Sequence, residues 1–154
     1  METIEDAKEK FMLRIEDGAE CPCCGQYAKL YKRPFGSAMA RALVWLVREY
    51  ERNDRWYNIH EFPLIQGRRG GGDFAKLVHW GLIQERETED DDTARRASGF
   101  WRPTGSGIQF AHRRLLVPKR VHLYNNQIRG WDSEYIDISG ALGKKFDYAE
   151  LMAS

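Results

Sequence analysis

The clearest pattern of hydrophobic and polar positions lies in the second quarter of the chain and has the spacing of an α-helix. Apolar residues stand there at i, i+3, i+4, i+7, i+8 and i+11, and these are Met39, Ala42, Leu43, Leu46, Val47 and Tyr50. The pattern predicts a helix over about residues 38–52 that buries one face. Ser37 is its candidate N-cap, and Asn53 marks its end.

A shorter amphipathic helix is predicted at the N-terminus, with Thr3 as its candidate N-cap and Gly18 as its stop. Its apolar stripe needs a packing partner and consists of Ile4, Ala7, Phe11 and Ile15. Residues 26–32 alternate loosely and predict a short strand, which Pro34 and Gly36 break.

The pattern from residue 56 predicts short elements. A brief extended piece and a small helix are expected over 56–62, followed by a helix over 74–80. Asp73 is well placed to cap that helix, and Gly81 to end it in the left-handed conformation. The side chains expected on its buried stripe are Phe74, Leu77 and Val78.

Two strands are then predicted over 82–86 and 99–104, joined by a polar loop over 87–98. Thr104 is expected to cap a helix over about 105–115. Its inward residues are expected to be Ile108, Ala111 and Leu115.

The period changes after residue 117, where two extended runs flank Asn125-Asn126 and predict a β-hairpin over 121–131. The remaining expected elements are a third short strand or turn over 135–139 and helical turns over 140–142 and 148–152, capped by Ser139 and Asp147. The fold class expected is α+β. Three segments are expected: an N-terminal helix and Cys-rich turn over 1–36, a core over 37–116, and a hairpin with short helices over 117–154.

Composition fits a soluble globular domain, with 42% hydrophobic and 31% charged residues among 154. No apolar run approaches the roughly 20 residues that span a bilayer, and no secretory signal is evident, so no membrane partner is expected. Three cysteines make an odd number, which favours a reducing compartment. The net charge of +1 conceals local basic runs.

The central segment resembles the winged-helix superfamily over about residues 37–116. The motifs that carry this resemblance are Trp80-Gly-Leu-Ile83 and Trp101-Arg-Pro-Thr104-Gly-Ser-Gly107, together with the order of elements. In DNA-binding members, the helix before the wing enters the major groove. The resemblance therefore implies groove-facing candidates, which are Arg68, Arg69, Lys76 and His79.

A second basic group follows the core and consists of Arg113, Arg114, Lys119 and Arg120. Both groups have a plain alternative, that of solvated surface charges. The wing departs from the DNA-binding pattern, because residues 87–92 place five carboxylates where a phosphate contact would form. Either the wing points away from DNA, or the module binds a protein, since winged helices do both.

Catalysis finds little support in the sequence. The glycines of 67–72 lack the Lys-Ser/Thr of a phosphate-binding loop, and Asp73 would repel a phosphate. Neither a nucleophile elbow nor a metalloprotease helix is present. We expect no enzyme activity, and no small-molecule substrate is evident.

The run Cys21-Pro-Cys-Cys24-Gly25 resembles a zinc knuckle, in which two thiolates bind one ion. Cys21 and Cys24 are thus candidate zinc ligands, and a closed structural site needs four. The usual second pair is absent; a zinc could be shared between chains, or one of the four histidines His60, His79, His112 and His122 could complete the site. The alternative is a thiol-bearing turn without metal.

The whole chain resembles small uncharacterised proteins of tailed bacteriophages and prophages. The resemblance rests on the CPCCG turn, the SAMARALVWL helix, the GGDFAKL and WGLI runs, the VPKRVHLYNN hairpin and the LGKKFDYAEL end. It implies a location in the cytoplasm of the bacterial host cell and brings no activity. The expected function is non-catalytic DNA binding or regulation. The alternative is a protein-interaction module that modulates a host factor or belongs to the virion.

Overall fold

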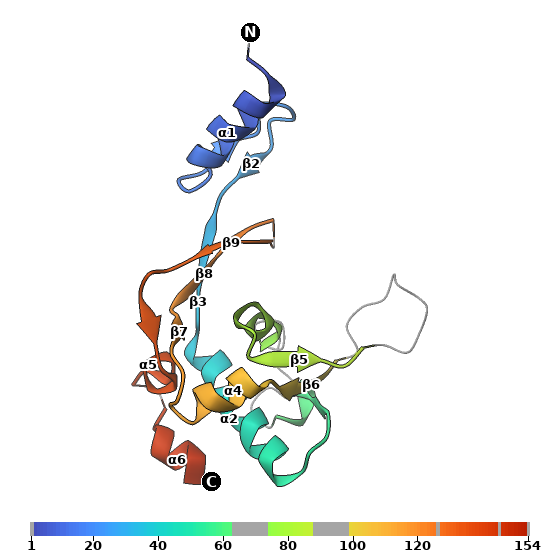
Figure 1. Cartoon of the computed structure of the whole chain (residues 1–154), viewed down its shortest axis with the longest axis vertical. Helices are drawn as coiled ribbons and strands as arrows, with labels where there is room; N and C mark the ends of the chain where they lie inside the picture. The colour runs from blue at the N-terminus through green and yellow to red at the C-terminus, as the bar shows by residue number, and fades with distance from the viewer. Residues whose placement is uncertain (1, 63–73, 88–98, 126, 145, 154) are drawn as a thin grey trace.

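The computed structural model of the chain describes residues 2–62, 74–87, 99–125, 127–144 and 146–153. It is a mixed α+β structure, as the sequence predicted (Figure 1). The first helix and the Cys-rich turn lie at one end of the molecule, and the last helix lies at the other. No helix in the described ranges has the length and apolar character that crossing a bilayer requires.

Helix α2 (Ser37–Arg52) is the centre of the core and confirms the strongest sequence pattern. Its buried residues are Met39, Ala40, Ala42, Leu43, Val44, Leu46 and Val47. The predicted cap is wrong, because Gly36 occupies the N-cap position and Ser37 is already helical. The reason lies upstream: the backbone N–H of Phe35 bonds to Lys119 O at 2.9 Å, which keeps the chain extended up to the glycine.

The central sheet is antiparallel and has the order β4-β6-β5. Its strands are β4 (Tyr57–Asn58), β5 (Ile83–Glu85) and β6 (Phe100–Pro103), with the 3-10 turn η1 (Ile59–Glu61) directly after β4. The predicted pairing of the two runs around the polar loop is confirmed, since Ile83 lies opposite Pro103 and Glu85 opposite Trp101. Most of that loop, residues 88–98, lies outside the described residues.

The helix predicted over 74–80 is helical, but its main part is the 3-10 helix η2 (Lys76–Trp80). A 3-10 helix has three residues per turn, so Phe74, Leu77 and Trp80 align on one side and Val78 turns outward. Burial of Val78 was therefore predicted wrongly: its side chain is 47% exposed. Gly81 ends the helix with φ +71°, as predicted, whereas its expected cap Asp73 lies outside the described residues.

Helix α4 (Gly105–Ala111) begins at the predicted cap, because the Thr104 hydroxyl accepts the Gly107 N–H at 3.1 Å. It ends four residues earlier than residue 115. Arg113 adopts φ +63°, and the backbone N–H groups of Arg113 and Arg114 donate hydrogen bonds to the last carbonyls of the helix. Ala111 is buried as predicted, and Phe110, which the pattern did not single out, is fully buried beside it.

The predicted hairpin is confirmed as β8 (Arg120–Tyr124) and β9 (Gln127–Trp131), with Asn125 left-handed at φ +50°. Strand β3 (Tyr31–Pro34) adds to it and gives the order β3-β8-β9. Pro34 was predicted to break a strand but ends this one, which is tolerated because β3 is an edge strand. The sheet thus joins residues 31–34 to the C-terminal segment.

The chain ends in short elements that pack on α2. The third strand, β10 (Tyr135–Ile136), pairs with β7 (Val117–Pro118) rather than with the hairpin. Helix α5 (Ile138–Leu142) is capped by Asp137, whose carboxylate accepts the Gly140 N–H at 2.7 Å, so the prediction of Ser139 is wrong. Asp147 does accept the Glu150 N–H at the start of α6 (Tyr148–Ala153).

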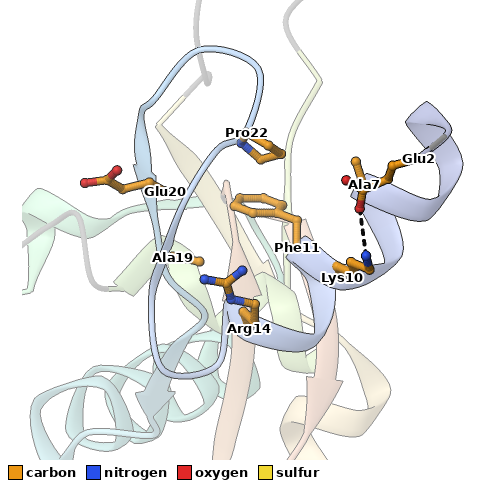
Figure 2. A pocket seen from close by; sticks show the side chains of 8 residues that line it. All are labelled: Glu2, Ala7, Lys10, Phe11, Arg14, Ala19, Glu20 and Pro22. Carbon is orange, nitrogen blue, oxygen red and sulfur yellow. Dashed lines mark ion pairs between the residues drawn. The ribbon is translucent and has the colours of Figure 1, made fainter.

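Helix α1 (Ile4–Arg14) confirms the predicted N-terminal helix, with a capping box between Thr3 and Asp6. The strands β1 (Ala19–Glu20) and β2 (Tyr27–Ala28) follow as a small antiparallel pair around the Cys-rich turn. Phe11 points from α1 towards Pro22 of that turn (Figure 2). Its ring also lies 6.3 Å from the ring of Tyr124, so Phe11 has its partners in the turn and the hairpin, whereas Ile4 of the predicted stripe is 69% exposed.

Candidate nucleic-acid interface

The helical segment 74–80 is held firmly against the rest of the molecule. Phe74 and Leu77 are buried in the core. The indole N–H of Trp80 donates to Pro118 O at 2.8 Å, and its ring meets those of Phe35 and Trp131 at 5.2 and 5.7 Å. The residues that this segment turns outward therefore have a fixed place relative to the sheet behind it.

Two of the sequence candidates, Lys76 and His79, are carried by this segment and are half-buried. Burial lowers the pKa of His79, and the nearby Lys76 ammonium lowers it further. The lowered pKa favours the neutral imidazole, so of these two side chains Lys76 is the one that brings positive charge to the segment. Arg68 and Arg69 lie outside the described residues.

The cations of the second basic group are largely engaged within the chain. Arg120 forms an ion pair with Asp132 at 2.9 Å, and Lys119 lies 3.6 Å from Glu134. Arg113 donates from Nε to the Ser139 hydroxyl at 3.0 Å, and its guanidinium lies 4.1 Å from the centroid of the Tyr148 ring. Arg114 is exposed. Three of these four side chains therefore serve intramolecular contacts as well as any external one.

The sheet next to η2 carries two arginines that the sequence did not single out. Arg86 lies 4.4 Å from the centroid of the Phe100 ring, and Arg102 lies 4.6 Å from that of Trp56. The Arg102 guanidinium also donates to Gln84 Oε1 at 3.3 Å. Strand alternation could have found Arg102, because it lies between the buried residues Trp101 and Pro103.

The Cys-rich turn is tight and closes the β1–β2 pair. Gly25 has φ +75°, and its N–H bonds to Cys21 O at 2.8 Å. The backbone N–H groups of Cys24 and Cys23 donate to the Cys21 sulfur and lower the pKa of this thiol. Such bonds favour the thiolate, which is the form that binds zinc. In the described part of the chain, no cluster brings three potential metal ligands together.

Two surface hollows flank this turn. One, of 290 Å³, lies between α1 and the turn around Phe11 and Pro22, with the Lys10–Glu2 ion pair at its side (Figure 2). The other, of 410 Å³, is lined by three tyrosines and both cysteines of the candidate pair. Sequence reasoning missed the second hollow, because β2, β3 and the hairpin tip are brought together only by the fold.

Comparisons of the chain with protein-family models, with curated proteins and with solved structures give no match. The function is therefore inferred from the geometry of the described residues.

Proposed function

We propose that residues 37–116 form a winged helix and that this module binds duplex DNA without catalysing a reaction. The observation that carries the proposal is the path of the chain around Gly81. A short helix leaves the core, turns at a left-handed glycine and enters the outer strand of a three-stranded antiparallel sheet with the order β4-β6-β5. This path supports the element order of a winged helix, with 74–80 as the recognition segment.

The cations and hydrogen-bonding side chains around this segment support DNA as its ligand. Lys76 and His79 belong to the recognition segment itself, and Arg86 leaves the end of β5, from which the wing would extend. Arg68 and Arg69 are proposed as further phosphate or base contacts, since arginine bonds guanine with two hydrogen bonds. In the bacterial host cell, such a module would act as a regulatory protein of a bacteriophage.

The experiment is a titration of labelled mixed-sequence duplex DNA over a range of salt concentrations. We expect Arg68→Ala with Arg69→Ala to weaken binding and to reduce the slope of log K against log salt by about 1.8, because each phosphate contact contributes about 0.9. The matched control is Lys8→Ala with Lys10→Ala, which removes the same charge from α1. Equal slopes for the two variants would count against the proposal.

A protein partner is the second candidate, and the engaged second basic group favours it. Contacts inside the chain hold Lys119, Arg120 and Arg113. That surface therefore offers less free positive charge than the sequence predicted. The outward Val78 and the exposed Leu116 add apolar area. A partner that is retained after nuclease treatment, and released by Val78→Asp, would support this candidate over DNA.

We also propose a structural zinc at the Cys-rich turn, held by Cys21 and Cys24. The two thiols fit half of a tetrahedral sulfur site, and two copies of the chain would supply all four ligands. The expected stoichiometry is then one zinc for two chains in the purified protein, lost with Cys21→Ser or Cys24→Ser. Cys23→Ser is the control, because it removes an exposed thiol from the same turn.

A further inference from the structure

The 410 Å³ hollow beside the Cys-rich turn has the lining of a ligand site. It is formed by β2, the start of β3 and the tip of the β8–β9 hairpin. Its lining includes three tyrosines, a lysine and two side-chain amides, namely Tyr27, Tyr31, Tyr124, Lys29, Gln26 and Asn125. Its volume lies in the range of about 300–1,000 Å³ that is usual for small-ligand pockets.

Two tyrosines of this hollow, Tyr27 and Tyr31, are exposed, and contacts hold Tyr27 and Tyr124 in position. Tyr27 is 63% exposed and Tyr31 is 51% exposed. The Tyr27 hydroxyl lies against Gly18, where a Cβ would come within 1.9 Å of it. Tyr124 is held by the edge-to-face contact with Phe11 at 6.3 Å. Exposed aromatic faces that are fixed in this way are ready to stack, because little rotamer freedom remains to be lost on binding.

Three cations lie at or near the rings, and one carboxylate residue, Glu20, lies opposite Tyr27 in the β1–β2 pair. Lys29 lines the hollow, while the guanidinium groups of Arg33 and Arg129 lie 5.7 and 5.8 Å from the ring centroids of Tyr31 and Tyr124. No carboxylate is among the described residues that line it. Aromatic rings interleaved with cations fit a chain of flat bases joined by phosphates better than they fit an uncharged ligand.

We infer that this hollow is a binding site for single-stranded nucleic acid. A base stacks on the tyrosine rings, the amides of Gln26 and Asn125 bond to its edge, and the neighbouring cations hold the phosphates on either side. A duplex does not fit this chemistry, because its bases are already paired and stacked. The site uses no residue of the recognition segment. It therefore goes beyond the proposed duplex binding and can be tested separately from it.

The test is fluorescence anisotropy of a labelled oligothymidylate of about 12 nucleotides with the full chain, and of an oligouridylate of the same length. Tighter binding of one of the two identifies DNA or RNA as the ligand. We expect Tyr31→Ala to weaken binding roughly tenfold, as the loss of one stacked base does. Tyr31→Phe keeps the ring and should bind like the natural protein.

The matched control is Tyr135→Ala, which removes a tyrosine of similar exposure, 56%, from β10. A second variant, Lys29→Ala with Arg33→Ala, should reduce the salt slope by about 1.4, since each contact on a single strand contributes about 0.7. If the tyrosine variants fail to fold, the salt slope of this variant tests the inference instead.

Two outcomes would overturn the inference: no binding of either oligonucleotide, or equal binding by the Tyr31→Ala and Tyr135→Ala variants. Duplex binding distinguishes this site from the proposed recognition segment. If Arg68→Ala with Arg69→Ala abolishes duplex binding but leaves oligothymidylate binding intact, the two sites are separate. If duplex DNA does not bind at all while the oligonucleotides do, only the winged-helix proposal fails.

Discussion

Among single residues, Gly107 shows most directly how a side chain, or the lack of one, fixes the position of an element. It lies in the first turn of α4, where a Cβ would stand 2.0 Å from Leu82 O. Because the obstacle is the backbone just before β5, it cannot be relieved by a rotamer change. The carbonyl and the helix can approach only because residue 107 has no side chain.

We therefore expect Gly107→Ala to lower the free energy of unfolding by about 2–3 kcal/mol, the upper part of the range for overpacking in a well-filled core. Urea unfolding followed by tryptophan fluorescence measures it. The control is Gly105→Ala in the same helix, where a Cβ meets nothing within 4 Å and the change should be close to neutral. Equal effects of the two substitutions would mean that α4 does not approach the sheet at this point.

At the scale of elements, the sequence predicted those whose pattern is local. Helix α2 was found because its stripe recurs over about three turns, and the hairpin was found because Asn125 tolerates a left-handed turn. The 3-10 character of η2 could not be predicted, since it depends on how Phe74, Leu77 and Trp80 meet neighbours distant in sequence. The extension of β3 through Pro34 depends in the same way on β8.

The candidate site follows the same rule. Runs of basic residues can be found in a sequence, but their partners cannot. Arg120 looked like part of a free patch, yet the chain returns after the hairpin and places Asp132 beside it. The tyrosine hollow was missed for the converse reason, because Tyr124 is distant in sequence from Tyr27 and Tyr31 and comes beside them only in the folded chain.

The cluster on the β8–β9 hairpin gives a prediction that depends on pH. The Asp132 carboxylate accepts hydrogen bonds from His122 at 2.7 Å and from Arg120 at 2.9 Å. These bonds hold the pKa of Asp132 below its usual value, and the bond from His122 has the larger effect. A carboxyl pKa lowered by folding adds stability above the unfolded pKa of about 3.9, and this stability is lost as the pH falls through the folded pKa.

We expect Asp132→Asn to be less stable than the natural protein at neutral pH, with a difference that shrinks below about pH 4. Thermal unfolding of both proteins at several pH values gives the measurement. Asp54→Asn is the control, because Asp54 is exposed and no ion pair is recorded for it among the described residues. A difference that does not change with pH would show that the carboxylate charge is not what stabilises the hairpin.

For the molecule as a whole, Trp80 connects the segment beside the central sheet to the C-terminal sheets. Its indole N–H reaches Pro118 in β7, and its ring contacts Phe35 just before α2 and Trp131 in β9. The boundaries expected at residues 36 and 116 are therefore bridged by one residue of η2. Elements joined in this way should unfold together, since opening either side exposes the same ring.

Trp80→Phe keeps a ring in this place but removes the bond to Pro118, which we expect to cost about 1–2 kcal/mol. If the chain is one cooperative unit, the loss should lower the hydrogen-exchange protection of the slowest amides in α2 and in β8 by the same free energy. Trp56→Phe is the control, because the Trp56 ring contacts Arg102 on the central sheet, within residues 37–116. Protection lost in β8 but kept in α2 would mean that the hairpin opens separately. The tyrosine hollow would then be able to open while the proposed recognition segment stays folded, and single-stranded and duplex binding would differ in their dependence on temperature.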